Sequence, residues 1–363
     1  MEYSLNEKVV IWLTAFEHMT EKRQYAILDL FEKPQDIFEK FEEKSEQIEG
    51  IVGKSNFDKM KPAFNNTFLN SYINNLNNLG ITVVTIFSHS YPKLMSKAFQ
   101  PPIALFCKGE IALLDSLCLA VVGTRKPTAY GKSITEKFTK ELCQSGFTIV
   151  SGLAYGIDTV AHETTLASGG KTIAVLGGGF NNIYPQMNVG LANEIAEKGL
   201  LVSEFAPSTA PTNYTFPKRN RTVALLSQGV LITEASNKSG TLHTKNFALE
   251  EGREVFATPG NINSEESKGS NEMIRNGEAC CVLCPEDIAT VFKKNVKPIE
   301  FKKQIQLSIE ENLVADLLRN SEVFYDDILS STGMEAKKLN GLLTTMQIRN
   351  IITKLPGNYY TLL

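Results

Sequence analysis

Apolar residues in the middle of the chain occur in short continuous runs rather than in strict alternation with polar ones. One run ends at Val122, where a glycine-bearing loop and a helical pattern follow, and the same unit then recurs up to Gly179. Continuous runs are typical of parallel strands buried on both faces, and the stretches between them are long enough for crossover helices. Further strands are predicted near residues 81–87, 200–203, 230–233, 254–257 and 279–283, with helices at 188–198 and 242–251. The pattern predicts one doubly wound α/β domain over residues 76–296.

The two ends of the chain show helical patterns instead of strand runs. Residues 1–75 predict short helices, and the letters SEQIEGIVGKS at residues 45–55 have the glycine spacing of a helix-hairpin-helix turn. A small packing domain and a DNA-contacting domain both fit this segment. Residues 293–303 are rich in lysine and have the composition of a linker. Residues 304–363 show three helical patterns and a terminal strand, which is the order of a winged-helix-like domain.

Composition and charge narrow the class of protein. The chain has 363 residues, of which 42% are hydrophobic, and a formal net charge of -3, so a protein that coats polyanions by bulk charge is excluded. The N-terminus lacks the features of a signal peptide, and no apolar run reaches the roughly 18 residues of a membrane helix. We therefore expect a cytoplasmic protein with no membrane contact.

The cysteines give no sign of a metal site. There are six at irregular positions, which indicates reduced thiols in an intracellular chain. Cys281 and Cys284 have a zinc-like spacing, but a second pair is missing and residues 280–283 have the pattern of a buried strand. We expect structural cysteines, no metal and no cofactor.

Glycine-bearing loops follow three of the predicted parallel strands. They are Gly123-Thr124-Arg125, Ser151-Gly152 and Gly177-Gly178-Gly179. Because loops at the carboxyl ends of parallel strands line one crevice, these loops should face a common space. Glycines let a ligand approach the backbone, and free N–H groups at helix starts favour anions. The loops therefore predict a phosphate-binding crevice.

Three catalytic interpretations fail on spacing. Gly131-Lys132-Ser133 resembles the end of a P-loop, but the motif needs glycine where Lys126 stands. The glycine run at residues 177–179 lacks the third glycine of a dinucleotide fingerprint. Ser151, Asp158 and His162 do not form a nucleophile elbow, which favours a capping or packing role for them. We expect a protein that is not an enzyme.

The letters FPKRNR at residues 216–221 give the sharpest local signal. An aromatic ring beside a proline, followed by cations, suits a single nucleic-acid strand, since the ring stacks on bases and the cations clamp phosphates. The alternative is a solvated helix start whose arginines pair with nearby carboxylates. The phosphate-friendly loops near Arg125, Gly152, Gly178 and Gly240 favour the first interpretation.

Taken together, the motifs resemble the DNA-processing protein A family, also called DprA or Smf. GTRKPTAYG, SGLAYGIDTVAH, KTIAVLGGG, FPKRNR, EASNKSGTLHT, TPGNI and SKGSNEMIRNG occur in the family's order between residues 121 and 278. The resemblance implies an extended Rossmann-like domain, flanked by an N-terminal helical domain of the SAM or helix-hairpin-helix type over residues 1–75 and a winged-helix-like domain over residues 304–363. It implies a cytoplasmic homodimer without catalytic activity. Such a protein would bind single-stranded DNA, protect it and load the recombinase RecA onto it during natural transformation.

The same resemblance implies the site residues. Arg125 would be the main phosphate contact, with Arg219 and Arg221 as its partners. The other residues carried over are Gly123, Thr124, Ser151, Gly152, Gly178, Phe216, Lys218, Asn220, Ser239, Gly240 and Thr241. This chain departs from the family at Tyr155, where an arginine is usual, which removes one cation from the rim of the crevice.

Two other functions remain open. One is a nucleotide-processing enzyme, a phosphoribohydrolase of the lysine-decarboxylase-like group, whose sheet and glycine loops are similar. That group needs a catalytic glutamate after its glycine run, and Thr244 stands there in this chain. The other is a sensor of a small phosphorylated ligand with the C-terminal domain as its output.

Overall fold

The protein forms two compact units in a computed structural model, Met1–Pro298 and Ile299–Leu363. The structure describes all residues except 1–2, 17–18, 293–306, 320–321, 350 and 363. The predicted linker at residues 293–303 lies outside the described residues.

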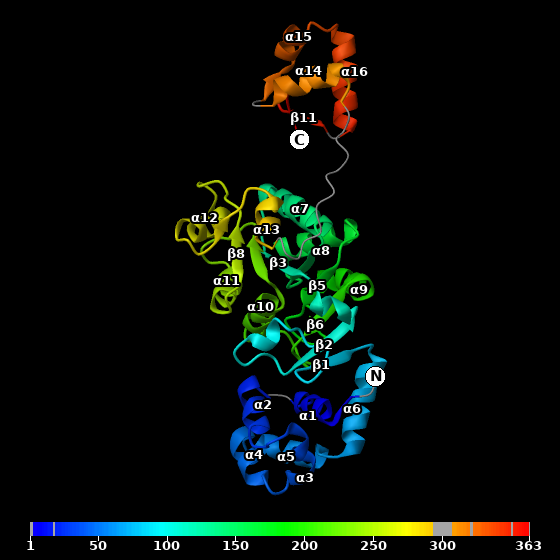
Figure 1. Ribbon diagram of the computed structural model, residues 1–363, viewed down its shortest axis with the longest axis vertical. Helices are drawn as coiled ribbons and strands as arrows, with labels where there is room; N and C mark the ends of the chain where they lie inside the picture. Colours follow the sequence, from blue (N-terminus) through cyan, green and yellow to red (C-terminus); the bar gives the residue numbers. More distant parts are fainter. Residues whose placement is uncertain (1–2, 17–18, 293–306, 320–321, 350, 363) are drawn as a thin grey trace. The chain divides into compact units, whose positions relative to one another are not determined.

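A nine-stranded sheet is the centre of the first unit over its described residues (Figure 1). Its order is β1-β2-β6-β5-β4-β3-β7-β8-β9. The pairings of β1 with β2 and of β2 with β6 are antiparallel, and all the other pairings are parallel. The strands are Thr82–Thr85 (β1), Ala104–Gly109 (β2), Cys118–Val122 (β3), Thr148–Ser151 (β4), Thr172–Val175 (β5), Leu200–Ser203 (β6), Gly229–Ile232 (β7), Glu254–Ala257 (β8) and Cys280–Cys281 (β9).

Helices cover both faces of this sheet, so the predicted doubly wound α/β fold is confirmed. Alternate residues of β3 show the two faces: Leu119 and Val121 pack with α7, α8 and α13, whereas Ala120 and Val122 pack with α10, α11 and α12. The helices are Ala129–Gln144 (α7), Ile157–Ala167 (α8), Val189–Lys198 (α9), Thr215–Leu226 (α10), Thr241–Glu250 (α11), Lys268–Arg275 (α12) and Pro285–Val291 (α13). Burial on both sides explains why the strand runs are continuously apolar.

The strand order reverses beside β3. After β3 the chain adds β4, β5 and β6 on one side, and the later strands β7, β8 and β9 lie on the other. Between β3 and β7 the two following loops diverge to opposite sides of the sheet, which leaves a crevice at the carboxyl ends of the strands. This is where a ligand site is expected in such a fold.

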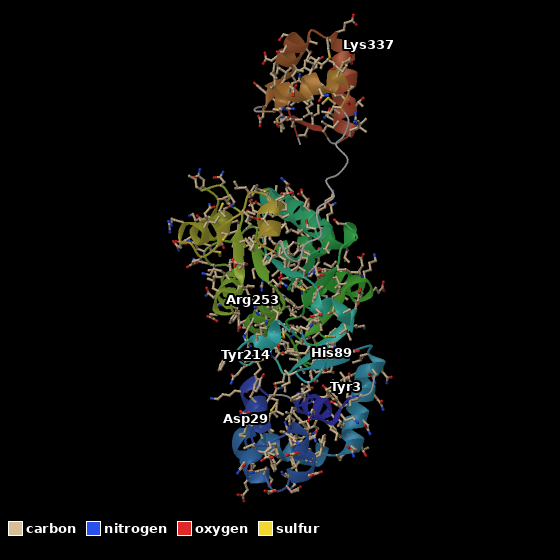
Figure 2. The ribbon with its side chains drawn as sticks, in the orientation of Figure 1. Tyr3, Asp29, His89, Tyr214, Arg253 and Lys337 are labelled. Atoms are coloured by element: carbon tan, nitrogen blue, oxygen red, sulfur yellow. The ribbon has the colours of Figure 1, made fainter. Side chains whose placement is uncertain are left out.

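The N-terminal helices share a core with the edge of the sheet. They are Leu5–Thr14 (α1), Glu21–Leu28 (α2), Ile37–Lys40 (α3), Ser45–Val52 (α4), Lys54–Met60 (α5) and Asn66–Asn78 (α6). Trp12 is fully buried in their core, which continues into Val83 and Phe106 of the sheet. The hydroxyl of Tyr3 accepts a 3.0 Å hydrogen bond from the Val83 amide (Figure 2). The predicted boundary at residue 75 therefore separates two regions that pack as one unit.

The glycine-punctuated segment of the N-terminal region consists of two helices with one residue between them. Gly53 ends α4 and precedes α5 with φ +83°, a left-handed conformation that few other residues adopt. Two helices joined by one glycine are what the expected helix-hairpin-helix turn requires locally, and both that assignment and DNA contact by this region stay predictions.

The second unit contains Ile309–Leu318 (α14), Val323–Phe324 (β10), Tyr325–Thr332 (α15), Ala336–Ile348 (α16), Ile352–Leu355 (β11) and Tyr359–Leu362 (β12). The strands form one small antiparallel sheet in the order β10-β12-β11. Lys338 pairs with Glu310, and Arg349 pairs with Glu311, so two cations at or just beyond the ends of α16 are engaged by carboxylates. Lys337, labelled in Figure 2, is exposed.

One strand prediction was wrong in its burial. Residues 280–283 were expected to form a buried strand, but β9 has only two residues, and both Cys280 and Cys281 are exposed at the edge of the sheet. Only Val282 in this stretch turns into the core.

Among the described residues, no three His, Cys, Asp or Glu side chains are grouped to hold a metal ion. Every helix in that part of the chain is too short or too polar to cross a bilayer.

Candidate nucleic-acid interface

A cleft of about 440 Å³ lies at the carboxyl ends of β3 and β7, and we call it the switch-point cleft. Its walls come from the loops after β3, β4 and β7, from the starts of α8, α10 and α11, and from the turn that contains Glu266. The lining residues are Val122, Gly123, Thr124, Arg125, Lys126, Ala154, Asp158, Arg219, Asn220, Ser236, Lys238, Ser239, Gly240, Thr241, Thr244 and Glu266. Two of the three predicted glycine loops thus reach the cleft or its immediate surroundings.

The loop after β3 is fixed by its backbone while its cations point to solvent. The Thr124 amide donates to the Glu234 carbonyl at 2.7 Å, and the Thr124 hydroxyl donates to the Glu266 carboxylate at 2.7 Å. Gly123 has no space for a side chain because Ile157 fills it. Arg125 and Lys126 are exposed. A loop held by hydrogen bonds therefore presents two exposed cations at the mouth of the cleft.

The N-terminus of α11 opens into the same cleft. Gly240 is its N-cap residue and provides no side-chain hydrogen bond to the helix amides. The Ser239 hydroxyl donates to Thr241 Oγ1 at 2.8 Å, and that hydroxyl donates to the Gly123 carbonyl at 3.0 Å. Because no atom lies within 4 Å of a side chain built at Gly240, the surroundings are open. The first amides of α11 are engaged within the chain: the Thr241 amide donates to Ser239 Oγ at 3.2 Å, and the Leu242 and His243 amides donate to the Ser239 and Gly240 carbonyls at 3.1 Å each. The positive end of the helix dipole still favours an anion here.

The N-terminus of α7 is instead occupied by the chain itself. The buried Glu234 carboxylate accepts the Thr128 amide at 2.8 Å and the Thr128 hydroxyl at 2.7 Å. At Gly131 a side chain would overlap this carboxylate. This contact gives the physical reason why the P-loop-like letters at residues 131–133 do not form a phosphate site: an internal anion already lies there.

Arg219 is a buried support beneath the cleft. It is only 5% exposed, its guanidinium donates to the Gly152 carbonyl, and its Nε donates to Asn220 Oδ1 at 2.9 Å. Gly152 must be glycine here because a side chain would overlap the guanidinium. Burial lowers the pKa of Arg219, whereas the neighbouring carboxylate of Asp158 raises it. Arg219 lines the cleft, but most of its surface is committed to these internal contacts.

Asp158 and His162 form a packing group with the loop after β4. Asp158 accepts the Gly152 amide at 3.1 Å and the Ala154 amide at 3.3 Å, and burial raises its pKa against the opposing effect of Arg219. Burial lowers the pKa of His162 to about 3, with Arg219 adding to the shift. The Ser151 hydroxyl is buried and donates to the Val121 carbonyl at 2.7 Å. These contacts agree with the predicted packing role and leave Ser151 out of the cleft.

The cations of residues 218–221 point in different directions because each residue of a helix is rotated by about 100° from the last. Lys218 lies 3.4 Å from Glu21 of α2 and over the ring of Tyr214, which Figure 2 labels. Arg221 donates to the Phe99 carbonyl at 2.6 Å and lies 3.4 Å from Glu251. The structure therefore does not bring Lys218 and Arg221 to the cleft. Both match the alternative interpretation of this segment, in which its cations pair with nearby carboxylates.

Two of the remaining predicted residues lie beside the cleft. Phe216 is near two guanidinium groups, since its ring centre is 5.7 Å from Cζ of Arg125 and 5.9 Å from Cζ of Arg219. A Cβ at Gly177 would contact this ring at 2.8 Å. Gly178 packs against Pro211 and is not among the residues that line the cleft. The third glycine loop therefore supports Phe216 instead of facing the common space.

Sequence reasoning missed four charged residues of the cleft: Lys126, Asp158, Lys238 and Glu266. Lys126 was considered only as a failed P-loop glycine and Asp158 only as part of a catalytic group. Lys238 follows β7, so its position after a predicted parallel strand was a signal that could have found it. Glu266 comes from a turn far along the chain and had no such signal. With Arg125 and Arg219, the cleft has four cations against two carboxylates.

Comparisons with known proteins agree with this architecture. The family model of DNA recombination-mediator protein A matches residues 82–293. The DNA processing protein DprA of Bacillus subtilis strain 168 is 43% identical over 210 residues, which are 58% of this chain and 70% of that protein.

Two solved structures are also similar. The X-ray structure of DNA processing protein A from Streptococcus pneumoniae has a TM-score of 0.66 and 32% identity, and covers 80% of this chain and 98% of that one. The structure of DNA processing protein A from Helicobacter pylori, which concerns its single-stranded DNA binding mode, has a TM-score of 0.54 and 34% identity. The match covers 60% of this chain and 98% of that one. Because the matched model spans the whole sheet and the loops of the cleft, this chain belongs to the family of DNA recombination-mediator protein A.

Proposed function

We propose that this protein binds single-stranded DNA in the switch-point cleft. The observation that carries the proposal is the arrangement of three exposed cations, Arg125, Lys126 and Lys238, around the N-terminus of α11. Phosphates bind to such cations and to the positive end of a helix dipole, and neither kind of contact distinguishes one base from another. Membership of a recombination-mediator family supports DNA as the anion.

Within this proposal the predicted residues have different tasks. Arg125 is the main phosphate contact, and Gly123, Thr124, Ser239, Gly240 and Thr241 form the polar floor. Ser151, Gly152, Arg219 and Asn220 hold that floor in place from below or from the side. Lys218 and Arg221 stabilise the packing of α10 and add to the positive potential without direct contact.

We further propose that the protein delivers the strand to RecA in the cytoplasm during natural transformation, and that it does so as a homodimer. The family supports the first part. Two linked clefts would raise the affinity for a long strand without any new contact, which supports the second. The exposed edge strand β9, with Leu283 beside it at 72% exposure, offers a surface on which a second copy could pair. Light scattering on the full chain measures the assembly directly.

A titration of labelled oligothymidylate and of a duplex of equal length tests the binding proposal. We expect tighter binding to the single strand, and a slope of log affinity against log salt of about -2 if three cations each meet a phosphate. Equal affinity for duplex, or binding that does not respond to salt, would contradict the proposal. Stimulated RecA assembly on the same oligonucleotide is expected if the protein is a mediator, and its absence would remove that part.

The alternative functions have a separate test. Incubation with nucleoside monophosphates and triphosphates, with and without DNA, should give no turnover, since the catalytic glutamate of the phosphoribohydrolases is replaced by Thr244 and Glu234 blocks the start of α7. Turnover that disappears in Lys132→Ala would show an active nucleotide site. Strong competition by a nucleoside monophosphate for oligothymidylate would favour a small-ligand sensor.

A further inference from the structure

A second, smaller hollow adjoins the switch-point cleft. It is lined by Arg125, Ala154, Tyr155, Tyr184, Phe216 and Arg219, and three of these residues, Arg125, Ala154 and Arg219, also line the cleft. We call the three rings of Tyr155, Tyr184 and Phe216 the aromatic shelf. We propose that Tyr155 and Tyr184 form a stacking site for a nucleobase of the strand whose phosphate is held by Arg125. This inference rests on the proposed function and adds a residue-level base contact to it.

The rings of the shelf form a continuous chain in which both tyrosines are exposed. Tyr155 and Tyr184 lie with ring centres 6.2 Å apart and planes at 78°, and Tyr184 and Phe216 lie 5.7 Å apart at 50°. Tyr155 is 37% exposed and Tyr184 is 46% exposed, whereas Phe216 is half-buried. Buried aromatic rings stabilise a core, but these two tyrosines leave over a third of their surface exposed beside a cationic cleft.

The backbone holds the loop of Tyr155 in place beside the loop of Arg125. Gly156, with φ +79°, lets its loop approach the Arg125 loop so closely that a side chain would overlap the Thr124 carbonyl. The Ile157 amide donates to that carbonyl at 3.2 Å. The position of Tyr155 relative to Arg125 is therefore set before any ligand binds.

Asn188 connects the loop of Tyr155 with the segment that follows Tyr184. Its side-chain amide donates to the Leu153 carbonyl at 2.9 Å and lies 2.9 Å from the hydroxyl oxygen of Thr159. Asn188 is itself buried. Because the two loops are tied together, the shelf is ordered in advance and binding would cost little conformational entropy.

The chemistry of the shelf favours a nucleobase over other occupants. The hollow is too small to enclose a ligand, so the contact it offers is stacking on its rim. Every nucleotide carries its base on the same sugar as its phosphate. Because Arg125 lines the same hollow as the two tyrosines, a phosphate bound to Arg125 would bring a base next to the shelf. Stacking of a base on an aromatic ring is tolerant of sequence, in keeping with a protein that accepts any strand.

The experiment compares oligothymidylate with an abasic oligomer of equal length, in which each sugar carries no base. The two probes have the same phosphates, so their affinity ratio isolates the contribution of stacking. We expect the full-length protein to prefer oligothymidylate by at least roughly fivefold, the lower limit for one base stacked on an aromatic ring. In Tyr155→Ala and Tyr184→Ala the ratio should fall towards one while the affinity for the abasic oligomer is retained.

Three further variants separate stacking from other effects. Tyr155→Phe keeps the ring and should keep the ratio. Tyr155→Arg exchanges a ring for a cation and should raise the affinity for the abasic oligomer and steepen its salt dependence, while lowering the ratio. Tyr359→Ala removes a tyrosine of similar exposure, 42%, in the second unit and should leave the ratio unchanged.

The outcomes distinguish this inference from the function on which it rests. Equal affinity for both probes in the unmodified protein would overturn the proposed stacking site. A ratio that is unchanged in both alanine variants would overturn it too, and would mean that the exposed tyrosines are available to a protein partner instead. If the abasic oligomer still binds through Arg125 in that case, single-strand binding stands. If neither probe binds, the proposed function fails as well.

Discussion

The loop at residues 123–126 and the start of α10 at residues 216–221 are both rich in cations, yet they use them in opposite ways. In the loop, Arg125 and Lys126 are exposed at the mouth of the cleft. In the helix, Lys218, Arg219 and Arg221 contact three different parts of the protein. Cations that are adjacent in the sequence therefore lie together in space only where the backbone conformation points their side chains in the same direction.

The local conformation explains the difference. A loop that leaves the carboxyl end of a buried strand has its core on one side only, so its side chains share one solvent-facing direction. A helix packed between a sheet and a second layer is surrounded, and consecutive side chains meet different neighbours. Variants that remove a cation from each region test this contrast, and their expected effects differ in kind as well as in size.

Arg219→Ala should have the largest effect, and on stability. It removes a buried guanidinium, leaves the Gly152 carbonyl without that donor, and leaves the carboxyl of Asp158 buried without its nearby positive charge. Breaking such a buried arrangement costs about 3 kcal/mol in free energy of unfolding. Urea denaturation of the full chain measures it, and Arg221→Ala, which is less buried, is the matched control. Equal losses in the two variants would show that Arg219 is not a special support.

Arg125→Ala should leave stability unchanged and weaken single-strand binding. A charge-assisted contact to phosphate contributes about 1.5 to 3 kcal/mol, or roughly tenfold or more in affinity. Lys132→Ala is the control because Lys132 is exposed on α7, where Glu234 already occupies the helix N-terminus. An oligothymidylate titration compares them. If both variants bind equally well, the role given to Arg125 is wrong.

Glu204→Gln should have a smaller, pH-dependent effect at the contact between α2 and α10. Burial raises the pKa of Glu204 well above its ordinary value of 4.5, and Glu21 raises it further, against Lys218 and Arg221. The folded protein thus retains a proton that the unfolded chain has lost. That stabilisation is complete below the ordinary pKa and is lost as the pH rises through the raised one.

The glutamine variant has no such loss, so at pH 8 it should be more stable than the unmodified protein by about 1 kcal/mol. The difference should shrink at pH 5. Thermal or urea unfolding at both values provides the comparison. A gap that grows towards low pH would mean that the carboxylate of Glu204 is stabilised by Lys218 and Arg221 in the folded state.

Truncation after Val296 should have the smallest effect. The second unit is compact by itself, and residues 301–363 contain equal numbers of basic and acidic groups. Lys338 of α16 is paired with Glu310, so this region offers little free positive charge for binding duplex DNA. We expect dimerisation and oligothymidylate binding to persist, with the tail serving protein contacts. Light scattering and titration on both chains decide it, and a monomeric or non-binding truncation would contradict the expectation.

The sequence predicted the sheet and the loops that follow its strands, because burial on both faces leaves continuous apolar runs that can be located to within a few residues. It also predicted that the loop of Arg125 lies at a crevice, since parallel strands end at the same edge, but it placed Gly178 there too, and Gly178 is not among the lining residues. The destinations of Lys218 and Arg221 could not be predicted, as they depend on Glu21 and Phe99, which are far away in the chain. One feature of the sequence is related to the burial of Arg219: position 152 is a glycine, and a side chain there would overlap the guanidinium.

The carboxylate of Glu234 at the start of α7 has a consequence for what can reach the protein in a cell. Metabolites such as inorganic phosphate and free nucleotides are abundant, and an unoccupied helix start beside Gly131 would attract them. With Glu234 in that position, a small ion that enters the switch-point cleft meets the start of α11 and separate cations among the described residues. A long strand can engage these groups together, whereas a free ion engages them singly. The abundant small phosphates of the cell should therefore be weak competitors, and the cleft should stay available to polymers.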